Sequence, residues 1–348
     1  MKVLLVGTGA YPIPPTGYGG VERVLGEYGQ ALETAGHTVR ILNEVHGAGS
    51  LAEYRFALGL PSRIRHETYD VVHVSTPVVA NRLAAAGIPY VYTSHSRHWF
   101  WRESWRHRWG WWLEKRAVRR AAGLVALTPE VETAMRAVLP ATFRSPLRVI
   151  PYGIDMEAYG PAWEARSGRR ALGVGIVIPL KRWEVASASL KGTGLVLRIA
   201  GPTPDEAYAS EVRSAGDGVE ILGEVDAPGL QRLYAESDML VHPSQVELLA
   251  RAVVEAMASG LPIVGSSSVG AWVADNRAGF VAPRGVSLED LTRFIQSSAE
   301  RLAGDRALRQ TMGESARSLA REKFSWDRVV AAHVELYQEV GRAADQPT

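Results

Sequence analysis

The sequence predicts two doubly wound α/β domains in one chain. Three observations lead to this fold class: a length of 348 residues, an alternation of short apolar strands with helical patterns, and a second start of that alternation near residue 170. A domain usually holds about 100–200 residues, so the length suits two domains. Strands that are apolar throughout are typical of parallel sheets with helices on both faces.

Residues 1–156 are expected to form the first domain. Its strands are predicted at residues 2–6, 39–42, 71–74, 90–93, 124–127 and 148–150. Between the first two strands, residues 19–32 carry apolar side chains at helical spacing, and Gly36 ends this helix. The alternation continues through the other strands, as a doubly wound domain requires.

Residues 157–325 are expected to form the second domain. Residues 155–170 combine turn formers with charges and lack a periodic apolar face, which indicates a linker. Strands are then predicted at residues 173–178, 195–200, 219–222, 239–241 and 262–264, with a helix at 250–259 and a helical pattern from 287 onward. The second half therefore repeats the architecture of the first.

The composition narrows the functional class. Charged residues make up 22% and hydrophobic residues 46% of the chain, which is typical of a globular protein, and the formal net charge is +2. So small a charge argues against a dedicated nucleic-acid binder. The absence of cysteine excludes disulfides, thiolate metal sites and cysteine nucleophiles. No apolar stretch approaches 18 residues, so we expect a cytoplasmic protein whose contact with a membrane, if any, is peripheral.

Several polar residues follow predicted strands, where open α/β sheets bind ligands. Gly19 and Gly20 precede the first helix, whose bare N–H groups suit a phosphate. Lys181 and Arg182 follow the first strand of the second half and also suit a phosphate. His95 follows a strand of the first half. A flexible helix lead-in, a solvated lysine and a structural histidine remain the alternatives.

Glu247 and Glu255 lie eight positions apart near the start of one predicted helix. Glu255 is inside the helix and Glu247 precedes it, so the two carboxylates cannot share one proton. They are placed to bind different hydroxyl groups of one extended ligand. The helix N-terminus at Leu249, Ala250 and Arg251 would face an anion. The alternative is one capping and one solvated glutamate.

Taken in order, these features resemble the retaining glycosyltransferases of family 4. The segments that carry the resemblance are PPTGYGGVERVL near the start, VIPYGID at 149–155, PLKRW at 179–183, Asp238 with His242-Pro243-Ser244, and E-LLARAVV-E at 247–255. The resemblance covers almost the whole chain. It implies the GT-B fold, with a cleft between two Rossmann-like domains and a last helix, at about 326–345, that returns to the first domain.

The resemblance also implies roles for these residues. Glu255 would bind the ribose of a nucleoside diphosphate sugar, and Glu247 its hexose. Lys181 would neutralise the diphosphate, the backbone at Gly20 would approach the distal phosphate, and His95 would contact the donor near the reacting carbon. A UDP-sugar is favoured and a GDP-sugar is second. The nucleotide sugar is a substrate, and neither a cofactor nor a metal is expected.

The chain departs from the family pattern near the donor site. Ile176 stands where the family usually has arginine, so Arg182 or Arg251 would have to replace that cation. Leu248-Leu249-Ala250 replaces a Gly-Phe-Gly stretch, and Tyr152 replaces an asparagine. These departures motivate an alternative: a non-catalytic membrane- or carbohydrate-binding protein on a glycosyltransferase scaffold.

A tryptophan-rich segment suggests the acceptor. Six of the ten tryptophans lie between residues 99 and 112, and residues 97–120 hold eight Lys or Arg against two Glu, a local net charge of +6. Helical spacing places four of the tryptophans on one face, next to two arginines: Trp101, Trp105, Trp109, Trp112, Arg102 and Arg106. Aromatic side chains flanked by cations are typical of a helix that lies on an anionic membrane. We therefore expect contact with anionic lipid or a lipid-linked acceptor. Stacking on an oligosaccharide, and packing within the protein or an oligomer, remain alternatives.

Overall fold

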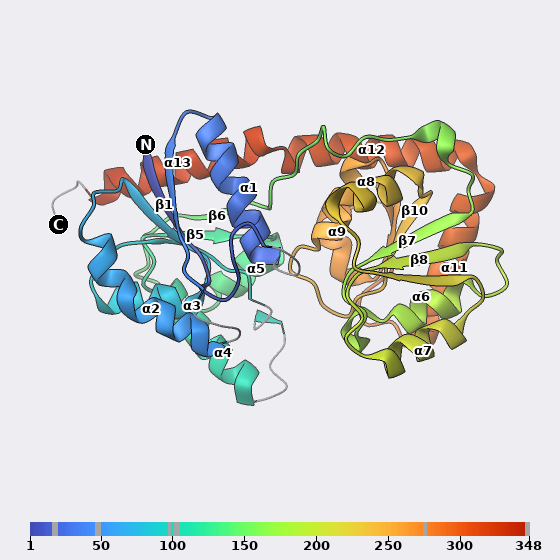
Figure 1. The fold of residues 1–348 in the computed structure, drawn as a ribbon, viewed down its shortest axis with the longest axis horizontal. Coiled ribbons are helices and arrows are strands. Elements are labelled where there is room, and N and C mark those ends of the chain that lie inside the picture. Colours follow the sequence, from blue (N-terminus) through green and yellow to red (C-terminus); the bar gives the residue numbers. More distant parts are fainter. Residues whose placement is uncertain (16–19, 46–49, 97–98, 101–104, 274–276, 345–348) are drawn as a thin grey trace. The chain divides into compact units, whose positions relative to one another are not determined.

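The structure is a computed structural model, and it describes residues 1–15, 20–45, 50–96, 99–100, 105–273 and 277–344 (Figure 1). It consists of two compact units. The first contains Met1–Gly153 and Trp326–Thr348, and the second contains Ile154–Ser325. The chain therefore leaves the first unit after Gly153 and returns to it after Ser325.

The first unit is built on a six-stranded parallel sheet in the order β2-β1-β3-β4-β5-β6. The strands are β1 (Lys2–Val6), β2 (Thr38–Leu42), β3 (Val71–Val74), β4 (Val91–Thr93), β5 (Gly123–Ala126) and β6 (Leu147–Val149). Their order reverses between β1 and β3. The carboxyl ends of these two strands therefore flank the topological switch point, where such sheets bind ligands.

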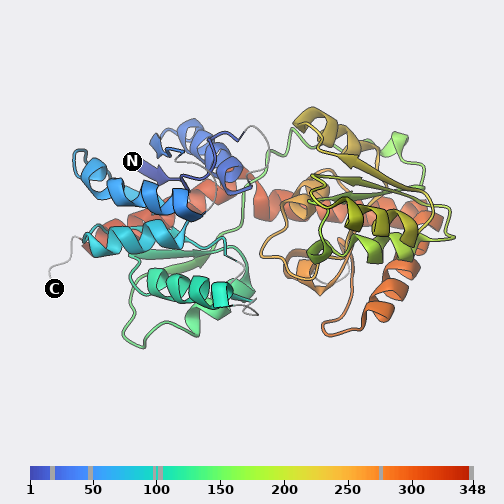
Figure 2. The same cartoon turned by 60° about the horizontal axis from the view of Figure 1, so that its bottom comes forward.

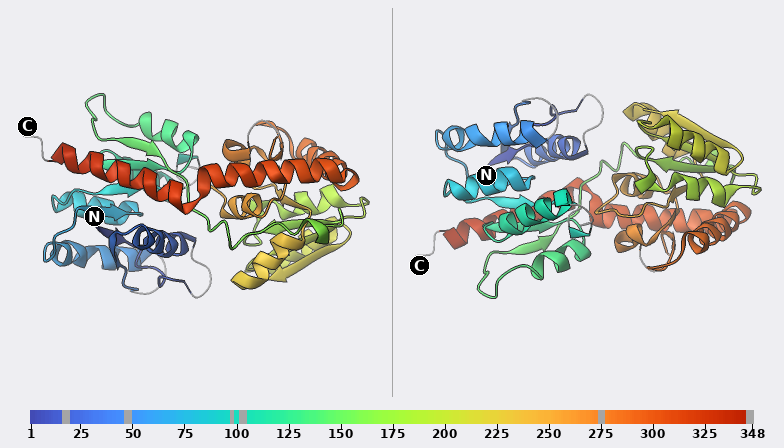
Figure 3. Two further views of the ribbon diagram at one scale, coloured as in Figure 1. Left: turned by 90° about the horizontal axis from the view of Figure 1, so that it is seen from above. Right: turned by 90° about the horizontal axis from the view of Figure 1, so that it is seen from below.

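Helices cover both faces of this sheet. On one face α2 (Ser50–Ile64), α3 (Pro77–Ala85) and α4 (Trp105–Val118) lie side by side (Figure 2). On the other face α1 (Gly20–Thr34) packs against α13 (Trp326–Ala344), which runs along the sheet as far as β5 (Figure 3). The remaining helix, α5 (Pro129–Arg136), contacts β5 and β6.

The last helix of the chain completes the core of the first unit. Tyr337 of α13 is 1% exposed. Its hydroxyl lies 2.7 Å from the hydroxyl of Tyr28 and 2.5 Å from Nδ1 of His73. Buried polar groups need such partners, so the first unit depends on residues about 300 positions away in the sequence.

The second unit contains another six-stranded parallel sheet, in the order β12-β11-β10-β7-β8-β9. The strands are β7 (Arg170–Val174), β8 (Val196–Ala200), β9 (Val219–Gly223), β10 (Met239–His242), β11 (Ile263–Gly265) and β12 (Gly279–Val281). The switch point lies between β7 and β10, because the chain proceeds outward from β7 in one direction and from β10 in the other.

Helices again cover this sheet. The pairs α6–α7 and α6–α11 pack together over a core that includes the fully buried Trp183, while α9 packs against α12. The helices are α6 (Trp183–Leu190), α7 (Glu206–Ala215), α8 (Ala227–Glu236), α9 (Arg251–Ala258), α10 (Gly270–Val273), α11 (Leu288–Gly304) and α12 (Arg306–Phe324), with 3-10 turns η2 (Trp163–Ala165), η3 (Pro179–Lys181) and η4 (Ser267–Val269). The prediction of two doubly wound α/β domains is confirmed.

Two strands of the second unit differ from the prediction. The first runs over Arg170–Val174 rather than residues 173–178, because Gly175 adopts a φ of 147° and turns the chain out of the sheet. The edge strand β12 was not predicted.

The segment 155–170 was predicted to be a linker, but from Ile154 onward the chain belongs to the compact second unit. Arg166 is 9% exposed, and its guanidinium donates to the carbonyl oxygens of Ser259 and Gly260 at 2.6 Å. The ring of Trp163 packs so closely on Gly313 that a Cβ there would lie 2.5 Å from it. Buried contacts therefore make this segment part of the second unit.

Asp238 holds the start of β7 in place. Its side chain is fully buried, and its carboxylate oxygens accept from the backbone N–H groups of Gly168 at 2.6 Å and Arg170 at 2.9 Å. Nε of Arg309 lies 3.9 Å away. The conspicuous acidic residue before β10 thus has a structural role.

We predict that Asp238→Asn lowers the free energy of unfolding by about 2–4 kcal/mol. An amide offers one oxygen where the carboxylate offers two, and its NH₂ group would face a backbone N–H. Urea unfolding measures the loss, with Asp217→Asn, at an exposed position, as the matched control. Equal stability of the two variants would contradict the structural role.

Candidate active site

The switch point of the second sheet brings together two residues of the predicted site. Lys181 lies in η3, after β7, and Glu247 lies in the loop after β10. Because β7 and β10 are parallel neighbours, their carboxyl ends open onto the same edge of the sheet. Nζ of Lys181 donates to Oε1 of Glu247 at 2.5 Å, although the two residues are 66 positions apart.

The Glu247 carboxylate is strongly stabilised in its ionised form. Its side chain is 13% exposed, and Oε1 also lies 3.0 Å from Nε2 of His242, the last residue of β10. Burial by itself would raise the pKa of Glu247, but the His242 hydrogen bond and the Lys181 charge together hold that pKa well below its usual range. Glu247 is therefore a charged acceptor at neutral pH.

The N-terminus of α9 lies between the two glutamates in sequence. The helix begins at Arg251, and no side chain caps it at Ala250. Leu249 and Ala250 are each 8% exposed. Uncapped N–H groups at a helix start attract anions, so this terminus suits a phosphate even though the family's glycines are absent.

Glu255 is buried inside α9 with partners of its own. It is 2% exposed, and it accepts from the Tyr234 hydroxyl at 2.9 Å and from Nε of Arg251 at 2.7 Å. Each carboxylate oxygen has a second lone pair, so these two contacts do not exhaust its capacity to accept hydrogen bonds. The sequence analysis missed Tyr234, because nothing in the local pattern of α8 points to a partner on α9.

Arg182 and Arg251 were the two candidates to replace the arginine that the family usually has at position 176, and the structure places them in different surroundings. Arg251 is engaged by Glu255. Arg182 adopts a left-handed conformation with a φ of 55° at the start of α6. Such a conformation is unusual for a residue with a side chain and often marks a functional loop. Among the described residues, no three His, Asp or Glu side chains gather as metal ligands.

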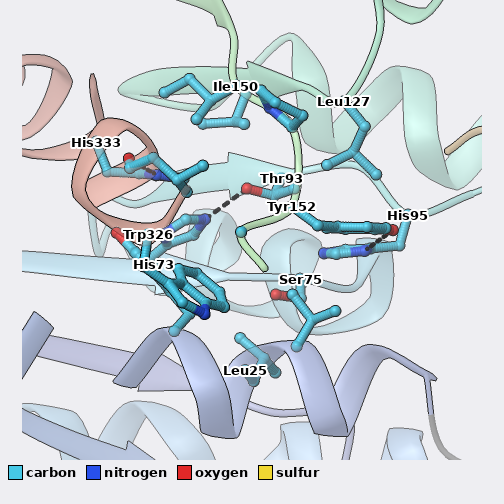
Figure 4. Close-up of a pocket in the computed structure, with 16 residues that line it drawn as sticks. Leu25, His73, Ser75, Thr93, His95, Leu127, Ile150, Tyr152, Trp326 and His333 are labelled. Carbon is cyan, nitrogen blue, oxygen red and sulfur yellow. Dashed lines mark hydrogen bonds between the residues drawn. The ribbon is translucent and has the colours of Figure 1, made fainter. Parts of the chain in front are cut away.

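The first unit has a cavity at the carboxyl edge of its own sheet (Figure 4). Its lining includes His73 within β3, Ser75 just after β3, His95 beyond β4, and Trp326 and His333 of α13. The lining is mainly apolar and aromatic. The cavity therefore lies at the carboxyl-terminal parts of β3, β4, β5 and β6, and the predicted site residue His95 contributes to it.

His95 is held by a residue that the sequence analysis noted only as a departure. Its ring stacks on Tyr152 with centroids 5.6 Å apart and planes 9° apart, and its Nδ1 lies 3.0 Å from the Tyr152 hydroxyl (Figure 4). Burial lowers the pKa of His95 to about 4, so its ring is neutral at pH 7. A neutral ring can accept or donate one proton in a hydrogen bond to a ligand.

Of the two glycines predicted to face a phosphate, Gly19 lies outside the described residues. Gly20 is exposed at the first position of α1, and a Cβ there would meet nothing within 4 Å. The backbone at this helix start is therefore open to a ligand.

The tryptophan-rich helix α4 presents two of its predicted residues to solvent. Trp109 and Trp112 are 53% and 42% exposed, and their rings stack with centroids 5.0 Å apart. The guanidinium of Arg116 lies 5.3 Å from the Trp112 ring. Trp101 and Arg102 lie outside the described residues, and of Trp105 and Arg106 only the backbone, in α4, is described.

The opposite side of α4 is anchored in the protein by a buried carboxylate. Glu114 is fully buried, and Oε2 accepts from the hydroxyl groups of Tyr92 at 2.8 Å and Ser94 at 3.0 Å. This contact fixes the rotation of the helix and turns the Trp109–Trp112 pair outward. None of the described helices is both long enough and apolar enough to cross a membrane.

Two buried histidines, His73 and His333, and the half-buried His95 make the first unit sensitive to acid. Desolvation lowers the pKa values of His95 and His333 to about 4, and it holds the pKa of His73 well below its usual range. These pKa values lie below that of an unfolded histidine, so the unfolded chain takes up protons more readily than the folded one. The free energy of unfolding is therefore undiminished above about pH 6.5 and decreases as the pH falls toward 4.

We predict that His333→Asn makes the loss of stability between pH 6.5 and 4 less steep by about 1 kcal/mol per pH unit. Asparagine retains a donor for the Val329 carbonyl oxygen, which Nδ1 of His333 contacts at 2.8 Å, but it takes up no proton. Urea unfolding at a series of pH values measures the slope. The exposed His66→Asn is the control, and an unchanged slope in His333→Asn would contradict the prediction.

Comparisons with known proteins agree with this geometry. The family model described as Glycosyltransferase Family 4 matches residues 47–158, and the one described as Glycosyl transferases group 1 matches residues 180–300. The sulfoquinovosyl transferase SQD2 of Arabidopsis thaliana is 27% identical over 286 residues, which cover 74% of this chain and 54% of that protein. The MMP alpha-(1->4)-mannosyltransferase of Mycolicibacterium hassiacum is 29% identical over 311 residues, 79% of this chain and 72% of that protein.

Solved structures share the fold over nearly the whole chain. Sucrose-phosphate synthase from Thermosynechococcus elongatus has a TM-score of 0.81 at 19% identity, and covers 98% of this chain and 99% of its own. Anabaena HepE, solved in complex with UDP-glucose, has a TM-score of 0.74 at 18% identity, with 96% and 99% covered. The expected GT-B fold is thus confirmed, and with both halves matched by family models the chain belongs to the family 4 glycosyltransferases.

Proposed function

We propose that this chain transfers a hexose from a nucleoside diphosphate sugar. The observation that carries the proposal is the arrangement at the switch point of the second sheet. There Lys181 pairs with Glu247, and Glu255 lies on the helix whose uncapped N-terminus follows Glu247. The cation and the helix N-terminus suit the phosphates of such a donor, and the two carboxylates suit its hydroxyl groups.

Each part of the donor has a candidate partner. Glu255 would accept from the ribose hydroxyl groups, and Glu247 from a hydroxyl of the hexose. Lys181, Arg182 and the N-terminus of α9 would neutralise the diphosphate. A UDP-sugar is the favoured donor. The structural neighbour HepE was solved in complex with UDP-glucose, which supports this choice.

The reaction would proceed with retention and without a metal. The bond between the anomeric carbon and the diphosphate breaks, the acceptor oxygen bonds to the same face of the sugar, and its proton passes to the departing phosphate. Lys181 and the helix dipole would stabilise the negative charge on the leaving group. The neutral ring of His95 would contact the donor sugar near the reacting carbon.

The acceptor would be lipid-linked, or the protein would dock on anionic lipid through α4. The exposed Trp109–Trp112 pair, the adjacent Arg116 and the local charge of +6 over residues 97–120 support this part of the proposal. An exposed aromatic pair beside a cation, in a segment of positive net charge, suits the boundary between lipid headgroups and acyl chains.

We predict that Glu247→Gln lowers the turnover of the donor about 10- to 100-fold while nucleotide binding persists, because an amide is a weaker acceptor than a carboxylate for a sugar hydroxyl. Donor hydrolysis is measured with UDP-glucose and GDP-mannose, with and without EDTA, and UDP affinity by calorimetry. The exposed Glu224→Gln serves as control.

The outcomes separate the two functions considered. A reaction that EDTA abolishes would contradict metal independence. Tight UDP binding without turnover of any common nucleotide sugar would favour the alternative, a non-catalytic binding protein on the same scaffold.

We predict that Trp109→Ala/Trp112→Ala weakens binding to anionic vesicles tenfold or more, since each ring contributes about 1.5–3 kcal/mol on burial in the interface. Co-sedimentation with anionic and zwitterionic vesicles measures the affinity of each variant for lipid. The matched control is Leu51→Ala/Leu58→Ala, which removes two side chains 61% and 66% exposed on α2. Unchanged binding would contradict lipid docking, and loss of oligosaccharide binding instead would favour sugar stacking.

A further inference from the structure

We propose that His242 is a positioning residue for the donor reaction. It holds Oε1 of Glu247 so that Oε2 is presented to the donor sugar. This inference rests on the proposed function and assigns a role to a residue that contacts Glu247 rather than the substrate.

The position of His242 is rigidly determined. It ends β10, it is 1% exposed, and its Cα pairs in register with Gly265 of β11. Its ring lies edge-on to the fully buried ring of Trp183, with centroids 6.2 Å apart and planes 89° apart. Nε2 therefore points at Glu247 from the framework of the sheet.

The chemistry decides which nitrogen carries the proton. An ionised carboxylate can only accept, so the contact of 3.0 Å requires Nε2–H as the donor. The other nitrogen, Nδ1, is buried and has no hydrogen-bond partner within the described part of the chain. A buried polar atom without a partner is costly. The unpartnered Nδ1 of His242 is explained if the ring has to keep Nε2 directed at Glu247.

Glu247 needs this support because its own backbone is irregular. It lies in a loop, between the end of β10 and the start of α9. Two donors from different elements, Nζ of Lys181 and Nε2 of His242, converge on Oε1. None of the described residues donates to Oε2. The carboxylate is thus held by one oxygen and has the other available.

Lys181 alone would orient the Glu247 carboxylate less precisely than Lys181 and His242 together. Its amine is carried by four rotatable methylene groups, and in the proposed reaction it also faces the diphosphate. His242 has a short, stiff side chain on a buried strand, so it would keep Glu247 oriented while Lys181 adjusts to the donor. A precisely held acceptor matters because small displacements of a positioning group lower the rate strongly.

The test compares two conservative variants. The amide nitrogen of glutamine reaches about as far as Nε2 of histidine, whereas that of asparagine reaches only as far as Nδ1. We expect His242→Asn to lower kcat for UDP-glucose turnover about 10- to 100-fold, with the Kd for UDP unchanged within about twofold. We expect His242→Gln to restore most of kcat.

A pH profile supplies a second readout. His242 helps to keep the pKa of Glu247 low, so its loss raises that pKa. The acid limb of kcat/KM should therefore move to higher pH in His242→Asn and return in His242→Gln. A residue that served only to fill the core would not produce this shift.

The outcomes are distinct. If the wild-type protein neither binds UDP nor turns over UDP-glucose or GDP-mannose, the proposed function fails, and this inference with it. If the wild-type protein is active but His242→Asn and His242→Gln are equally active or equally impaired, only the positioning role is overturned. Thermal unfolding of each variant identifies any loss due to misfolding, in which case His242→Phe, which retains the ring without a donor, replaces His242→Asn.

Discussion

The parallel pairing of β7 with β10 is the constraint on which the chemistry of the second unit depends. These strands are neighbours in the sheet although β8 and β9 lie between them in sequence. Because both run in the same direction, the residues that follow them share one edge. Lys181, His242 and Glu247 converge there, and the ion pair forms between side chains that are only 18% and 13% exposed. The Coulomb attraction within so poorly solvated a pair is stronger than at the surface, but it offsets the cost of removing both charges from water only when the geometry is good.

The first unit depends in a comparable way on its last helix. Tyr337 joins Tyr28 and His73 in a buried hydrogen-bonded group. A close approach also fixes the entry of this helix, since a Cβ at Gly153 would lie 2.1 Å from the Trp326 ring. The cavity that includes His95 is lined partly by the same helix. The cavity in the first unit therefore takes its shape only when α13 has packed against the sheet.

The departures from the family pattern have physical explanations in part. Ile176 lies where a cation is usual, and its carbonyl oxygen accepts from the indole of Trp183 at 3.1 Å, so its backbone still serves the fold. Tyr152 replaces an asparagine and supports the His95 ring by stacking. Leu249 and Ala250 are nearly buried, and the helix start beside them remains uncapped. Nothing in the structure explains why leucine replaces glycine at position 248.

The sequence by itself determined the two α/β domains, most of the strands and the residues that follow them, because apolar periodicity and helix ends are local properties. It did not reveal that Lys181 pairs with Glu247, that Tyr234 binds Glu255, or that residues 155–170 are packed rather than free. Those depend on strand order and on contacts between residues far apart in the chain. Only the tertiary structure decided them, since a hydrogen bond between distant residues leaves no periodic signal in either segment.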